Sequence, residues 1–127
     1  MTVVAVMLAG ALGAVARFVL DGAIKHGAIK QWRPTTFPWA TFAINVSGSL
    51  LLGFLAGLVM FHTAPAGWQT IVGTGFCGGY TTFSTASFET VRLAEQRRTM
   101  SAAVYAIGSL LVSSLACGLG LVLAWAI

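Results

Sequence analysis

The distribution of charge along the chain is the feature that most constrains its fold. From Pro34 to Phe88 no residue carries a formal charge. One membrane crossing needs only about 20 apolar residues, so this run of 55 residues must hold two crossings and a turn. The turn is expected at residues 63–67, where proline and glycine fall close together.

Two further uncharged runs flank this stretch, one starting at Thr2 and the other covering Thr99 to Ile127. Only 8% of the residues are charged and 57% are apolar, which excludes a soluble globule. We therefore expect an all-α membrane protein, a single transmembrane domain over residues 1–127. Its four transmembrane helices are expected at residues 3–24, 39–61, 68–89 and 100–126.

Basic residues gather in two of the three expected loops. The first and third loops hold six of the seven Lys and Arg residues, namely Lys25, Lys30, Arg33, Arg92, Arg97 and Arg98. The middle loop and the termini hold none, so the positive-inside rule predicts that both termini face outward from the plasma (inner) membrane. Cations spread over separate loops do not form the stripe of a nucleic-acid-binding protein.

The third span departs most from a regular membrane helix. Glycines occupy positions 73, 75, 78 and 79, and hydroxyl and β-branched residues follow as far as Ser87. Both features weaken a helix, so we predict a break near residues 78–82. Broken backbone at membrane depth is tolerated where it is buried in protein or lines a cavity, and its freed polar groups can hold an ion. The alternative is an unbroken glycine-rich helix whose hydroxyls bond to the preceding turn.

Polar side chains also occur in the second and fourth spans. Asn45 either forms a hydrogen bond between helices or belongs to an ion path. Thr41 lies one helical turn earlier on the same face. In the fourth span Tyr105, Ser109 and Ser113 recur every four residues and form a hydroxyl stripe down one helical face. The stripe serves either helix packing or a polar track.

A basic side chain lies near the end of the first span. Arg17 precedes Asp21 by one helical turn, so the two form an ion pair, or Arg17 belongs to an electropositive vestibule that concentrates anions.

Carboxylates are absent from the middle of every expected span, and Glu89 lies only at the end of the third. Cation pathways and proton-coupled carriers usually place carboxylates at depth. The interior groups are instead mostly hydrogen-bond donors, which suit a small anion that has lost its hydration. Catalytic, phosphate-binding and zinc-binding spacings are missing, and we interpret Cys77 and Cys117 as small buried apolar residues.

Three stretches carry a resemblance to a known family: GAVAR at 13–17, NVSG at 45–48 and GGYTTFST at 78–85. They resemble the Fluc (CrcB) fluoride channels, and the resemblance covers the whole chain. It implies an antiparallel dimer that exports fluoride passively, with a structural sodium ion at the dimer centre held by the carbonyls of Gly78 and Thr81. The anion pathway is then expected along Thr41, Asn45, Phe83, Ser84, Thr85, Tyr105, Ser109 and Ser113, with Arg17 in the vestibule.

Two features depart from the family pattern. Ala86 stands where the family has a second phenylalanine, so we expect a pore that is altered or inactive at this point. The loop charges favour a single orientation in the membrane, whereas an antiparallel homodimer needs the chain to insert in both orientations. We expect a homodimer, and the alternative is a heterodimer with an oppositely oriented homologue. Two other functions stay open, a four-helix proton-coupled multidrug exporter and a membrane scaffold without transport.

Overall fold

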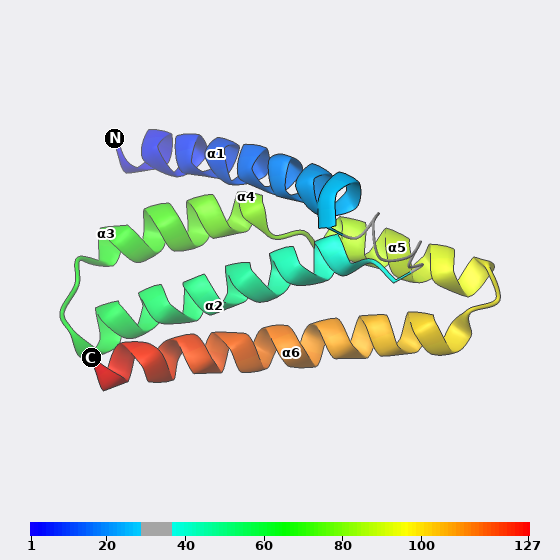
Figure 1. Ribbon diagram of the computed structural model, residues 1–127. Helices are drawn as coiled ribbons and strands as arrows, with labels where there is room; N and C mark the ends of the chain where they lie inside the picture. Colours follow the sequence, from blue (N-terminus) through cyan, green and yellow to red (C-terminus); the bar gives the residue numbers. More distant parts are fainter. Residues whose placement is uncertain (29–36) are drawn as a thin grey trace.

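The computed structural model of the chain describes residues 1–28 and 37–127. All regular elements in these ranges are helices (Figure 1). In chain order they are α1 (Thr2–Ala23), η1 (Ile24–Ala28), α2 (Trp39–Phe61), α3 (Ala66–Trp68), η2 (Gln69–Cys77), α4 (Gly78–Tyr80), α5 (Phe83–Glu95) and α6 (Thr99–Ala126). Lys30 and Arg33, two of the predicted cytoplasmic cations, lie outside the described residues.

Four rods lie side by side along one common direction (Figure 1). Within the described residues, three helices are long and apolar enough to cross a membrane: Thr2–Gly27, Trp39–Phe61 and Thr99–Ala126. The fourth rod consists of two shorter helical segments in series, which confirms the predicted all-α membrane subunit with a broken third helix. Both termini and the turn before α3 lie at one end, and the connection from α5 to α6 lies at the other (Figure 1).

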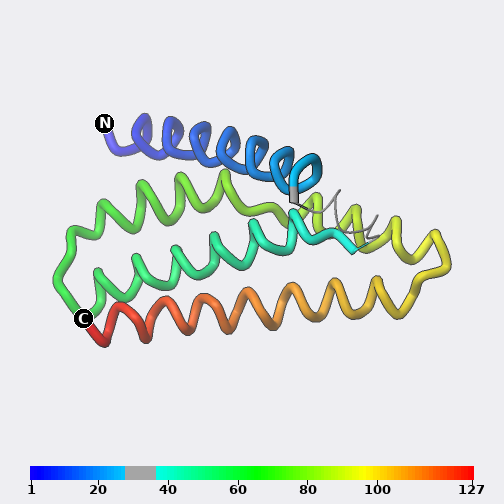
Figure 2. Tube along the Cα trace, in the orientation of Figure 1, coloured from blue at the N-terminus to red at the C-terminus, as the bar shows by residue number. Residues whose placement is uncertain are grey.

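The third rod breaks where the sequence predicts. The helix runs through α3, η2 and α4, with η2 wound as a π-helix, and the trace then steps sideways into α5 (Figure 2). Thr81 and Thr82 have extended backbone, with ψ angles of 161° and 124°. Helix α5 continues to Glu95, six residues past the predicted end of the span, because Leu93 is buried in a cluster with Ala102 and Tyr105 of α6.

Glycines set the spacing between the rods. A Cβ on Gly53 would collide with the Cys117 backbone in α6, and a Cβ on Gly79 would collide with the Gly10 backbone in α1. Small residues recur at four-residue spacing at 53 and 57 and at 75 and 79, a pattern typical of close helix packing, and these contacts show such packing. They bring α2 against α6, and α1 against η2 and α4.

The outer faces of the rods are apolar. Helix α1 exposes a long row of Val, Leu, Met and Phe side chains, and α6 exposes a similar row from Met100 to Trp125. Apolar surface of this extent is stable against lipid tails and not against water. The chain is therefore a multi-spanning membrane protein.

Candidate ion-binding groove

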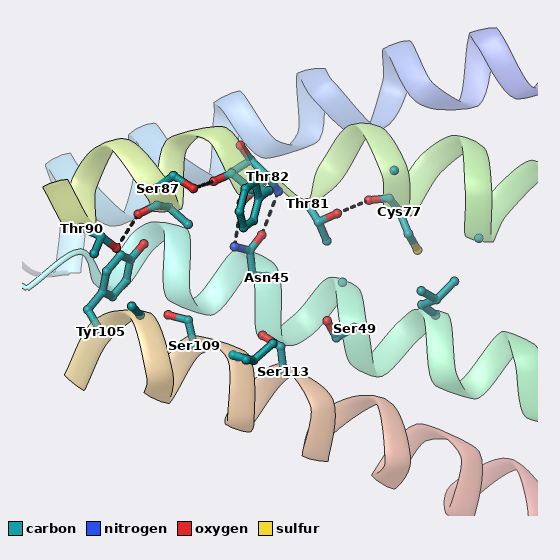
Figure 3. Close-up of a pocket in the computed structure, with 18 of the residues that line it drawn as sticks. Asn45, Ser49, Cys77, Thr81, Thr82, Ser87, Thr90, Tyr105, Ser109 and Ser113 are labelled. Atoms are coloured by element: carbon teal, nitrogen blue, oxygen red, sulfur yellow. Dashed lines mark hydrogen bonds between the residues drawn. The ribbon is translucent and has the colours of Figure 1, made fainter. Parts of the chain in front are cut away.

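A groove with a volume of about 830 Å³ runs beside the break, between α2, α5 and α6. Its walls come from every rod except α1 (Figure 3). Hydroxyl and amide groups reach it from all of these walls, and they belong to Asn45, Ser49, Thr74, Thr81, Thr82, Ser87, Thr90, Tyr105, Ser109 and Ser113. The groove therefore offers many hydrogen-bonding groups within an otherwise apolar bundle.

Hydroxyl side chains terminate the helices on both sides of the break. The Thr81 hydroxyl donates to the Cys77 carbonyl oxygen at 2.8 Å, and so closes the last turn of α4 on itself. The Thr82 hydroxyl accepts from the Thr85 backbone N–H at 3.2 Å, which makes Thr82 the N-cap of α5. The threonine pair that follows the glycines thus both ends one helix and starts the next.

Asn45 of α2 holds the break from the opposite wall. Its Oδ1 accepts from the Thr82 backbone N–H at 2.8 Å, and its Nδ2 donates to the Thr82 carbonyl oxygen at 2.9 Å (Figure 3). Asn45 also lines the groove. The two interpretations of this amide are therefore compatible, since it bonds a neighbouring helix and borders the groove as well.

The hydroxyl stripe of α6 faces the groove, as Figure 3 shows for Tyr105, Ser109 and Ser113. Tyr105 is fully buried and donates to Glu89 Oε2 at 2.8 Å. Ser109 Oγ is buried and has no hydrogen-bond partner within the described part of the chain. A buried hydroxyl without a partner is costly, so its position in the groove indicates a site prepared for a ligand.

Other hydroxyls in the groove are satisfied within their own helices. Ser87 donates to the Phe83 carbonyl oxygen at 2.9 Å, and Thr90 donates to the Ala86 carbonyl oxygen at 2.8 Å. These two hydroxyl groups are therefore satisfied by hydrogen bonds to the preceding turn of their own helix. The Ser109 hydroxyl differs because it has no such bond within the described residues.

Arg17 lies against the break and not against Asp21. Its Nε donates to the Gly79 carbonyl oxygen at 3.4 Å, whereas Asp21 pairs with Lys25 at 2.8 Å. The ion-pair interpretation of Arg17 is therefore wrong. The residue four positions beyond Asp21 supplies its partner, since Lys25 extends along the same exposed face of the helix.

Backbone carbonyls are the available cation ligands near the break. Within the described residues, no three His, Cys, Asp or Glu side chains come close enough to hold a metal ion. Gly78 lies at the surface, where an added Cβ would meet nothing within 4 Å. A cation here would be held by main-chain oxygens, and the Gly78 and Thr81 carbonyls fit this role because the break separates them from the helical ladder.

The structure brings together five of the eight predicted pathway residues in the groove: Asn45, Phe83, Tyr105, Ser109 and Ser113. Thr41 is buried beside Tyr105, and its hydroxyl interacts with the phenol from behind the groove wall. Ser84 and Thr85 do not line the groove, because α5 begins at Phe83 and turns both toward the Thr82 cap.

Sequence reasoning missed several residues of the lining. Ser49 lies four residues after Asn45, and Ser87 and Thr90 lie four and seven residues after Phe83. Helical spacing from the identified positions therefore would have found all three. Thr74 belongs to the π-helical segment η2, so regular α-helical spacing does not place it.

Aromatic side chains near the groove are distributed unevenly. Ala86 lines the groove at the place where the family pattern has a phenylalanine. Phe88 does not fill this space, because its side chain is exposed and lies outside the lining. Phe83 is in the lining but remains 87% exposed in the described part of the chain.

These features define a class of protein: a small, multi-spanning helical membrane protein with a broken helix beside a polar groove. Residues 4–121 match the family described as CrcB-like protein, Camphor Resistance (CrcB), and the chain belongs to this family.

Relatives with assigned names are similar over nearly the whole chain. The fluoride-specific ion channel FluC 1 of Leifsonia xyli is 50% identical over 121 residues, which cover 95% of this chain and 85% of that protein. FluC of Nitrobacter winogradskyi is 45% identical over 87% of this chain and 85% of its own length. FluC 2 of Cutibacterium acnes is 44% identical over 97% of each chain. All three are named as ion channels and not as enzymes.

Proposed function

We propose that this chain forms a passive, fluoride-selective ion channel that exports fluoride from the cytoplasm. The observation that carries the proposal is the unpartnered Ser109 hydroxyl in a groove that also holds the Asn45 amide and further hydroxyls. The relatives, which carry the name fluoride-specific ion channel, support the same anion.

The chemistry of the groove suits a small anion. Fluoride concentrates its charge in a small volume, so it enters an apolar bundle only where closely spaced donors replace its water. The hydroxyl groups of Ser109 and Ser113 and the second N–H of the Asn45 amide provide such donors, whereas the Tyr105 hydroxyl already donates to Glu89. Among the described residues that line the groove there is no Asp or Glu, so no carboxylate in this lining repels the anion.

Passage follows the groove past the break. In this proposal Phe83 offers the positive edge of its ring to the anion, and Thr41, Ser84 and Thr85 support the path from behind. Arg17 attracts anions toward the channel entrance as a vestibule charge. The channel need not change conformation or couple to protons, because Ser109 and Ser113 present hydroxyl groups to the groove one helical turn apart.

A second subunit completes the site. The groove is open on one side, where Phe83 is 87% exposed. Gly78 is also exposed, on the neighbouring surface. We propose an antiparallel dimer, with a second copy as the favoured partner. The six-to-zero distribution of basic residues between the two ends favours the alternative, an oppositely oriented homologue.

Labelling of a cysteine tag at the C-terminus distinguishes these two partners. Equal labelling from both sides of the membrane, in a background without Cys77 and Cys117, supports the homodimer. Labelling from one side alone supports the heterodimer.

A structural sodium ion fits the dimer centre. The break releases carbonyl oxygens at Gly78 and Thr81, and two antiparallel copies would bring four of them together around one cation. Sodium would neutralise the carbonyl dipoles that face each other at this contact. Its role in this proposal is to hold the break and the interface.

Efflux from proteoliposomes tests the function. A channel releases fluoride rapidly along its own gradient when potassium and valinomycin remove the charge imbalance, without any proton gradient. Release that needs a proton gradient indicates an exporter of the multidrug type, and absence of flux with correctly inserted protein indicates a scaffold. Either of these two results contradicts the proposal.

A further inference from the structure

Asn45 makes both of its hydrogen bonds to a single residue in the break. Oδ1 accepts from the Thr82 N–H at 2.8 Å, and Nδ2 donates to the Thr82 carbonyl oxygen at 2.9 Å (Figure 3). The side-chain amide therefore pairs with both backbone groups of Thr82, in the way that a neighbouring backbone would. Such a double contact fixes position more firmly than one bond does.

The bond to Oδ1 determines whether the Gly78 carbonyl is available. In a continuous α-helix the Thr82 N–H would donate to the carbonyl oxygen four residues earlier, which is that of Gly78. Asn45 takes this N–H instead. Within the described residues, no backbone N–H donates to the carbonyl oxygen of Gly78 or Thr81.

Arg17 occupies the carbonyl next to Gly78. Its Nε reaches across from helix α1 and donates to the Gly79 carbonyl oxygen at 3.4 Å. Side chains of two different helices thus take the carbonyls of Gly79 and Thr82. The carbonyls of Gly78 and Thr81 stay unpaired within the described backbone, and these are the two proposed cation ligands.

We propose that Asn45 is the positioning residue of the cation site: by capturing the Thr82 N–H, its Oδ1 keeps the Gly78 carbonyl available to a cation. The inference rests on the sodium site proposed above. One side chain then serves both ions, since it borders the anion groove and holds open the backbone that binds the cation. Without an acceptor at position 45, the Thr82 N–H returns to Gly78 and the helix closes across the break.

Three variants separate this role from a general loss of structure. Asn45→Asp keeps an oxygen acceptor for the Thr82 N–H and places a carboxylate beside the anion groove. Asn45→Leu has a similarly branched but larger side chain and offers no acceptor. Ser114→Ala is the matched control, because Ser114 is exposed on α6 beside the hydroxyl stripe and outside the groove lining.

The first measurement is the sodium concentration that gives half of the maximal protection of the purified dimer against thermal dissociation. In N45L the Gly78 carbonyl must first release the Thr82 N–H, and one net hydrogen bond corresponds to about a fivefold change in an equilibrium constant. We expect at least this increase in the sodium requirement of N45L. N45D keeps the acceptor and adds a negative charge near the cation, so it should need no more sodium than the wild type, and S114A should stay within about twofold of the wild type.

The second measurement is the ¹³C chemical shift of the Gly78 carbonyl, with and without sodium. It should respond to sodium in the wild type and N45D, and in N45L it should respond only at the correspondingly higher sodium concentration. Fluoride efflux should fall in N45D because of its carboxylate, so the variant separates the two ions. Should N45L fail to assemble, Asn45→Ser replaces it, because its hydroxyl is too short to reach Thr82.

Two results overturn the inference: an unchanged sodium requirement in the variant without an acceptor, or an equal increase in N45D. A wild-type dimer that sodium does not protect overturns the sodium site and this inference together. Wild-type fluoride efflux tests the channel itself and is independent of these outcomes.

Discussion

Removal of the Ser109 hydroxyl is expected to stabilise the subunit and to slow fluoride transport. Ser109 Oγ is buried and has no partner within the described part of the chain. Burial of an unpaired hydroxyl costs roughly 1–3 kcal/mol. Because the groove is open on one side, we take the lower end and expect Ser109→Ala to raise the free energy of unfolding by about 1 kcal/mol.

The effect on transport has the opposite sign. A hydrogen bond to a charged group contributes roughly 1.5–3 kcal/mol, so loss of this donor should slow fluoride efflux by about 10- to 100-fold. A residue that costs stability and supports activity is typical of a functional site.

Two assays measure these effects on the same preparation. Equilibrium unfolding in mixed micelles gives the stability, and a fluoride electrode gives the efflux from liposomes at matched protein density. Ser114→Ala should change neither quantity, because its hydroxyl is exposed and lies outside the groove lining. A Ser109→Ala protein that is less stable than the wild type, or that transports fluoride at the wild-type rate, refutes the reasoning.

Further predictions concern packing, the groove wall, the helix break and the cation. Gly53→Ala should destabilise the α2–α6 contact by about 1–3 kcal/mol through overpacking, whereas Gly118→Ala has open space and should not destabilise; unfolding in micelles measures both. Tyr105→Phe removes the donor to Glu89 and should lower stability by roughly 1.5–3 kcal/mol in the same assay. Thr82→Ala removes the N-cap of α5 and should cost about 1 kcal/mol. Replacement of sodium by N-methylglucamine should lower the dissociation temperature of the dimer.

Each of these predictions has a contradicting result. Equal stability of the two glycine variants would remove the argument for close helix contact at position 53. A Tyr105→Phe protein as stable as the wild type would show that Glu89 finds another donor. A Thr82→Ala protein with unchanged stability would contradict the cap, and a dimer indifferent to the cation would contradict the sodium site.

The fold follows from sequence where lipid makes the requirement strict. Runs without charge must cross the bilayer as helices, so the helices α1, α2 and α6 begin and end within a residue or two of the predicted bounds. The break followed from the glycines and threonines near Gly78, because both disfavour helix. The end of α5 at Glu95 did not follow, since it depends on the burial of Leu93 against another helix.

The groove was predictable only in part. Residues spaced by whole helical turns, such as Ser109 and Ser113, share a face whatever the tertiary structure, so the α6 wall was predictable. Contacts between different helices were not predictable, because they depend on how the rods pack. Examples are the hydrogen bonds of Asn45 to Thr82 and of Arg17 to Gly79. Spacing alone suggested the wrong ionic partner for Arg17.

The central claim is passive, selective movement of fluoride through the donor-lined groove, and the reversal potential of the current across a planar bilayer tests it most directly. With fluoride gradients imposed at equal pH and equal chloride on both sides, the reversal potential should shift by about 59 mV for each tenfold change in the fluoride ratio. A reversal potential that stays near zero under these fluoride gradients, or that shifts when a chloride or proton gradient replaces the fluoride gradient, would contradict the account.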